Sequence, residues 1–155
     1  MNKILVFIIV MLSFVTTKSQ VIKTVNISPG GLTGALTSTE KNTVTSLTIT
    51  GTMDARDFKI IRDNMPNLAE LDFHLALVAG YSGTGGTMLN MTTFDYQANA
   101  IPEYAFNGCK SLSKVTVPSI TVLKTGAFLS CKALTTITLP TSVTSIQATA
   151  FTDCS

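Results

Sequence analysis

The C-terminal third of the chain repeats itself every 22 or 23 residues, and this period constrains the fold more than any other feature. Ala-Phe dipeptides recur in step, and each is followed three residues later by a cysteine. The pattern Leu-x-x-Val-x-Val-Pro that begins at Leu112 returns as Leu-x-x-Ile-x-Leu-Pro at Leu134. A period of this length with spaced apolar residues indicates a solenoid, because one coil cannot bury its own apolar face and must stack on another.

The spacing of the leucines predicts a leucine-rich repeat solenoid. Such a fold has short parallel β-strands on its concave face, helix and loop segments on its convex face, and an N-terminal cap. Weaker copies of the repeat begin at Val44 and Leu68. Alternate residues of a strand face opposite sides, so stacking should align the outward positions in two rows. These rows are Ser46, Glu70, Lys114 and Thr136, and Thr48, Asp72, Thr116 and Thr138.

Stacking also predicts which side chains meet. Glu70 and Lys114 should be neighbours on adjacent strands. The phenylalanines of the Ala-Phe dipeptides should form an aromatic column, made of Phe106, Phe128 and Phe151.

The region before the repeats carries helix and strand signals. Residues 50–66 fit a convex-side helix, since Asp54 can cap it, apolar residues recur at helical spacing and Pro66 follows its end. Val25 and Ile27 alternate with polar residues, as in a strand, and residues 32–36 fit a short helix. We expect this segment to cap the first coil.

The first residues are typical of an export signal. A lysine at position 3 precedes an apolar run over residues 4–15, which is too short to span a bilayer. The predicted organisation is therefore a signal peptide at 1–19, an N-terminal cap at 20–43 and the solenoid at 44–155, truncated in its last coil. The buried N-terminal helix or strand remains the alternative for residues 1–19.

The interval from Leu68 to Leu112 is twice the period, so one coil should carry an insertion at about 79–99. This insertion is rich in glycine at its start and contains Tyr81, Phe94 and Tyr96. Long insertions in solenoids form loops that often bind ligands. We expect a flexible surface loop with no packing role.

Composition and motifs exclude several classes of chemistry. Without Lys3 and Lys18, 9 basic residues balance 9 acidic ones, so there is no electrostatic attraction to nucleic acid. The cysteines lie at the repeat period rather than at metal-ligand spacing, which favours buried thiols over a disulfide or a metal site. Asp72 and His74 should share a strand face, but no G-x-S-x-G motif supplies a nucleophile. We predict no catalytic residues, no cofactor and no membrane span in the mature chain.

The Ala-Phe-x-x-Cys and Leu-x-x-Val/Ile-x-Val/Leu-Pro motifs over residues 101–155 resemble the BspA-like leucine-rich repeats of exported bacterial proteins. The stretch from Leu47 to Leu71 resembles the region that precedes such repeats. This resemblance implies a secreted or cell-surface module, without enzymatic activity, that adheres to a host protein or glycan. A structural spacer, or the N-terminal part of a larger surface protein, is the alternative.

The predicted ligand contacts lie on the strand rows and on the insertion. They are Glu70, Asp72, His74, Tyr81, Tyr96, Lys114, Thr116 and Thr138.

Overall fold

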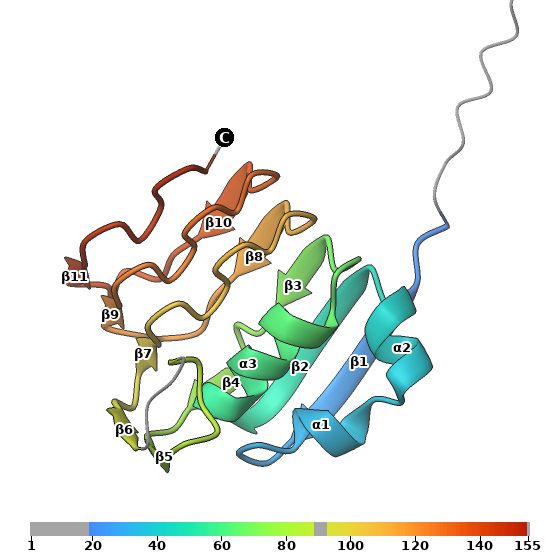
Figure 1. The fold of residues 1–155 in the computed structure, drawn as a ribbon, viewed down its shortest axis with the longest axis horizontal. Coiled ribbons are helices and arrows are strands. Elements are labelled where there is room, and N and C mark those ends of the chain that lie inside the picture. Colours follow the sequence, from blue (N-terminus) through green and yellow to red (C-terminus); the bar gives the residue numbers. More distant parts are fainter. Residues whose placement is uncertain (1–18, 89–92, 155) are drawn as a thin grey trace, which may run out of the picture.

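A computed structural model describes residues 19–88 and 93–154 (Figure 1). The predicted signal peptide lies outside the described residues except for its last residue. The helices are α1 (Leu32–Ala35), α2 (Ser38–Thr43) and α3 (Ala55–Asn64). The strands are β1 (Ile22–Ile27), β2 (Ser46–Met53), β3 (Glu70–Asp72), β4 (Ala76–Val78), β5 (Tyr81–Gly83), β6 (Phe94–Tyr96), β7 (Ala100–Ile101), β8 (Lys114–Thr116), β9 (Val122–Leu123), β10 (Thr136–Thr138) and β11 (Ser145–Ile146).

The main sheet is parallel and has the order β1-β2-β3-β8-β10, with β4 also paired to β2 (Figure 1). β3 pairs directly with β8 although more than forty residues separate them, as expected of one coil that carries an insertion. Val115 of β8 is buried, whereas its neighbour Lys114 is exposed. The chain therefore builds the predicted stack of parallel strands.

A second parallel sheet joins the coils on another side, in the order β11-β9-β7. Its register places Ile101 beside Leu123 and Leu123 beside Ile146. These three residues are spaced by the 22- and 23-residue period of the repeat. These strands were not predicted, because a strand of two residues leaves no alternation to detect.

The helices lie on one side of the N-terminal half of the main sheet (Figure 1). The predicted helix at 50–66 is shorter, because β2 continues to Met53 and α3 begins only after Asp54. Asp54 caps α3 as predicted, by accepting a hydrogen bond from the Arg56 backbone N–H at 2.9 Å. The predicted strand around Val25 and the short helix at 32–36 are both present, as β1 and α1. That residues 20–43 act as a cap stays a prediction.

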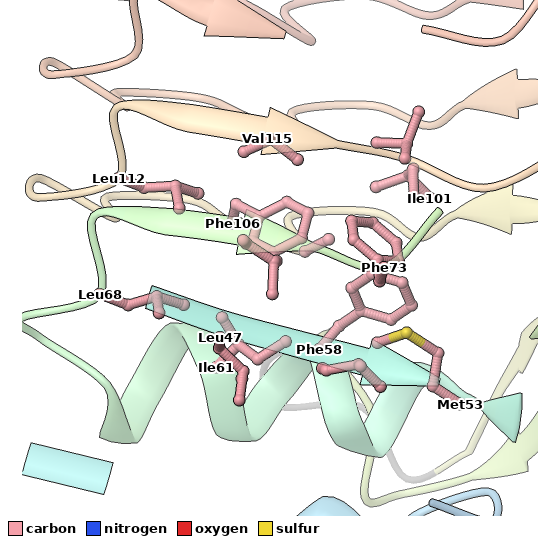
Figure 2. Close-up of a cluster of buried hydrophobic side chains, with 14 of the residues drawn as sticks. Leu47, Met53, Phe58, Ile61, Leu68, Phe73, Ile101, Phe106, Leu112 and Val115 are labelled. Carbon is pink, nitrogen blue, oxygen red and sulfur yellow. The ribbon is translucent and has the colours of Figure 1, made fainter. Parts of the chain in front are cut away.

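The core contains the predicted column of phenylalanine rings. Phe106 and Phe128 stack with ring centroids 4.8 Å apart. The column also continues toward α3, because Phe106 lies edge-on to Phe58 at 5.6 Å and beside Phe73 at 6.3 Å (Figure 2). The aromatic rings thus connect the repeats to the helical half of the protein.

Left-handed residues form a further ladder between coils. In the middle coil, Gly126 and Ser130 have φ of 62° and 57°. Their N–H groups donate to the carbonyls of Ala148 at 3.1 Å and of Thr152 at 2.8 Å in the next coil. In the preceding coil, Tyr104 and Gly108 also have positive φ, and their N–H groups donate to carbonyls of the middle coil in the same way. The ladder adds regular hydrogen bonds outside both sheets.

Candidate binding surface on the main sheet

The solvent-facing side of the main sheet, called here the outer face, carries the two predicted rows of side chains. The register pairs Ser46 with Glu70, Glu70 with Lys114, and Lys114 with Thr136. The second row pairs Thr48, Asp72, Thr116 and Thr138 in the same way. The predicted neighbours Glu70 and Lys114 therefore stand side by side, because the 22-residue period and the two-residue alternation together determine the register.

A shallow hollow of about 230 Å³ lies in the middle of these rows. Its polar lining consists of Ser46, Thr48, Glu70, Asp72, Lys114 and Thr116. The side chain of Glu70 forms no ion pair or hydrogen bond among the described residues. Its carboxylate is thus free to meet a ligand.

Asp72 and His74 form an exposed pair at the edge of the hollow. Nδ1 of His74 lies 2.7 Å from Oδ1 of Asp72, and the backbone N–H of His74 donates to the same oxygen at 3.1 Å. The expectation that both lie on one strand is wrong, since β3 ends at Asp72 and His74 lies in the following turn. The turn folds back so that the Asp72 carboxylate receives both groups.

Two leucines beside this pair are exposed. Leu75 and Leu77 each keep 66% of their surface accessible, although Ala76 between them is buried. Leu77 pairs with Thr52, which extends the surface along β4 and β2. This apolar patch was not predicted, because β4 lies outside the repeat pattern. Its one signal was the alternation of Leu75, Ala76 and Leu77.

The insertion is not a free loop. β5 and β6 form an antiparallel hairpin in which Tyr81 pairs with Tyr96. Tyr96 is buried, and its hydroxyl accepts a hydrogen bond from the backbone N–H of Met88 at 2.7 Å. Tyr81 is half-buried, with the guanidinium of Arg56 4.6 Å from its ring centre. The expectation that the insertion has no packing role is wrong, and Tyr96 contributes to the packing.

The glycines of the hairpin make room for these rings. A Cβ on Gly86 would lie 2.3 Å from the Tyr96 ring, and one on Gly83 would lie 2.5 Å from the Tyr81 hydroxyl. Gly85 donates its backbone N–H to that hydroxyl at 3.2 Å. The glycines predicted to give flexibility instead allow close packing.

Arg62 on α3 joins the hairpin to the repeats. Its guanidinium donates to the carbonyl of Thr87 at 2.7 Å and to that of Tyr104 at 3.0 Å, with only 7% of the side chain exposed. Asp63 accepts a further hydrogen bond from Arg62 at 2.7 Å. This buried cation serves as a structural link.

The cysteines follow the column of phenylalanines. The thiol of Cys131 donates to the carbonyl of Phe106 at 3.0 Å, and that of Cys154 donates to Phe128 at 3.1 Å. Burial raises the pKa of Cys131 to about 12, and burial also raises the pKa of Cys109 to about 12. Their protonated form is therefore favoured in the folded protein, so these thiols are weak nucleophiles at neutral pH.

Other parts of the described chain offer weaker candidates for a functional site. A more apolar hollow of about 330 Å³ lies between the end of α3 and the turn at Cys109, away from the outer face. Across residues 19–88 and 93–154, no group of three metal-ligating side chains comes together. None of the helices in those two segments has the length and apolar character needed to cross a membrane.

Residues 85–155 match the family described as the BspA type leucine rich repeat region (6 copies). The match confirms the resemblance of the repeats and begins within the insertion, at Gly85. Regions of this family are generally non-enzymatic scaffolds for protein binding. No curated protein matches the chain.

Proposed function

Since residues 85–155 form a BspA-type leucine-rich repeat region, we propose that the protein is a non-enzymatic extracellular module that binds a protein or glycan through its outer face. The observation that carries this proposal is the hollow that contains Glu70, Asp72 and Lys114. Charged side chains on adjacent strands can contact one ligand together, whereas a face with no binding role needs no such cluster.

We propose different roles for the predicted contacts. Glu70, Lys114 and Thr116 line the hollow, and Asp72 lies there with His74 beside it. Thr138 extends the row on β10 and is exposed. Tyr81 offers a half-exposed ring on the hairpin, while the buried Tyr96 supports it from behind at 6.0 Å between ring centres. A binding role for these residues stays a proposal.

Adhesion of mature protein to extracellular-matrix proteins and mucin glycans tests the proposal. The variant Glu70→Ala/Lys114→Ala/Thr116→Ala removes three side chains from the hollow. A matched control, Ser119→Ala/Thr141→Ala, changes exposed residues of two coils outside the rows. We expect at least a tenfold loss of adhesion for the first variant and none for the control, with similar melting temperatures. Equal adhesion of both variants would place the site elsewhere.

The proposal includes export. It is supported by the charge and apolar run of residues 1–19. N-terminal sequencing of protein recovered from a bacterial host should begin at Gln20 or within a few residues of it. Intact protein beginning at Met1 in the cytosol would contradict export. If the mature protein adheres to nothing in the panel, a spacer that presents another domain becomes the better explanation.

A further inference from the structure

We infer that the ligand of the outer face is an extended polypeptide segment in which basic side chains are followed or preceded by large apolar ones. This inference rests on the proposed function and narrows its partner from protein or glycan to protein. It rests on the order of side chains along one line of the outer face. This line begins with the acidic Glu70 and Asp72 on β3 and ends with the apolar Leu75 and Leu77 at β4.

The acidic end of this line favours basic groups. Glu70 and Asp72 are two residues apart on β3, so both carboxylates face outward, about 7 Å apart along the strand. Lys114 is the one lysine or arginine that lines the hollow, and its register partner on β3 is Glu70 rather than Asp72. A lysine or arginine of a ligand can therefore approach Asp72 and the open side of Glu70 without meeting a fixed positive charge. His74 carries a positive charge only when it is protonated.

The apolar end favours large aliphatic or aromatic groups. Leu75 and Leu77 are two of the five large hydrophobic residues that are exposed in the described part of the chain. Ile22 at the start of β1 and Val21 just before it lie at the far edge of the sheet, and Ile146 lies on the second sheet. Two exposed leucines beside a charged hollow form a patch that a partner side chain would cover with a gain in free energy.

The shape of the line suits a polypeptide rather than a sugar. The register on β2 places Glu70 beside Ser46 and Leu77 beside Thr52, so an extended segment of about seven residues matches that length. Within β3 the outward groups lie two residues apart, which is also the spacing of side chains on one side of a bound extended chain. In the part of the sheet that the structure describes, the outward residues include no aromatic ring on which a sugar face could stack.

Binding of short synthetic peptides to the mature protein tests the inference. The probes are acetylated Lys-Thr-Lys-Thr-Leu-Thr-Leu-Thr and its reversed sequence, because the direction of the bound chain is open. Controls replace both lysines by glutamate, or both leucines by serine. Fluorescence anisotropy should detect one of the two probes, with at least tenfold weaker binding for each control peptide. Equal binding of the probe and the glutamate control would overturn the inference.

Protein variants locate the contact. Glu70→Gln/Asp72→Asn should weaken the lysine-containing probe at least fivefold and leave the glutamate control unchanged. Leu75→Ser/Leu77→Ser should weaken the probe at least tenfold. Ile22→Ser is the matched control, since Ile22 is equally exposed at 65% but lies on the edge strand β1. Melting temperatures show that each variant is folded. An equal loss with Ile22→Ser and with the leucine variant would overturn the inference.

The outcomes separate this inference from the proposed function. If neither peptide binds, and mucin glycans bind and are displaced only by other glycans, the peptide inference is overturned. The protein would then still be a binding module. Failure of peptides, matrix proteins and glycans alike would overturn both.

Discussion

The rings of Phe128 and Phe151 are stacked within 5° of parallel, with their centroids 5.3 Å apart. Phe128 is fully buried because Phe106 covers its other side, whereas Phe151 belongs to the last described coil and is only partly buried. Two residues with the same place in the repeat therefore differ in how many neighbours they have.

This difference gives a prediction about stability. Phe128→Ala should lower the free energy of unfolding by about 3–5 kcal/mol, because it leaves a cavity between two coils. Phe151→Ala should cost much less, since solvent already reaches that ring. Urea denaturation measures both values, and equal losses would contradict the stacked column.

The hairpin gives a second prediction. Gly86→Ala should destabilise the protein by about 1–3 kcal/mol, because the added Cβ would overlap the buried Tyr96 ring. Gly34→Ala is the matched control, since a Cβ at that helical position would meet no atom within 4 Å apart from its chain neighbours and its own helix backbone. There the change should be neutral or stabilising by up to about 1 kcal/mol. Thermal melting distinguishes them, and a harmless Gly86→Ala would mean that the hairpin is not packed.

The buried thiols predict a loss of stability at alkaline pH. The pKa of Cys131 rises from 9.0 to about 12 on folding, so its contribution is fully present below pH 9. As pH increases toward 12, only the unfolded chain loses the proton, and stability should fall by about 1.4 kcal/mol per pH unit for this group.

Comparison with Cys131→Ala isolates the effect. The variant should show a shallower decrease of stability between pH 9 and 12 in urea titrations. In the native protein at neutral pH, Cys131 should also react with alkylating agents only after unfolding. Rapid native labelling, or the same pH slope in both proteins, would contradict the burial of this thiol.

Acid should weaken the contact between β1 and α2. Glu40 forms an ion pair with Lys23 and caps α2 with Thr37, and these hydrogen bonds lower its pKa from 4.5 to about 2. Its contribution is therefore fully present above pH 4.5 and is lost as pH falls toward 2. Glu40→Gln should remove part of the acid dependence of unfolding between those values. An unchanged acid limb would mean that the ion pair does not form in solution.

The sequence was sufficient to predict the pairing of β2, β3, β8 and β10, because a fixed period and a two-residue alternation allow only one register. Glu70 beside Lys114 and Phe106 beside Phe128 follow from that register alone. The helix α2 was missed since it has no buried residue, although Thr37 and Glu40 form a capping box that could have indicated it.

The candidate site was predicted only in its repeated part. The exposed Leu77 belongs to β4, which pairs with β2 outside the repeat, and Leu75 lies in the turn before that strand, so the exposure of both depends on tertiary structure. The insertion is rich in glycine, as flexible loops are. Only the positions of the Tyr81 and Tyr96 rings in the structure show that these glycines are packing contacts.

The link made by Arg62 has a consequence for how the protein unfolds. In a stack of coils each repeat contacts only its neighbours, so opening can proceed from one end, one coil at a time. Arg62 strengthens one of these neighbour contacts, because its guanidinium holds the carbonyl of Thr87 in the insertion and that of Tyr104 in the adjoining coil at once. Fraying that begins at β10 and β11 should therefore stop at β8, and the part from α3 to the Tyr104 turn should open as one cooperative unit.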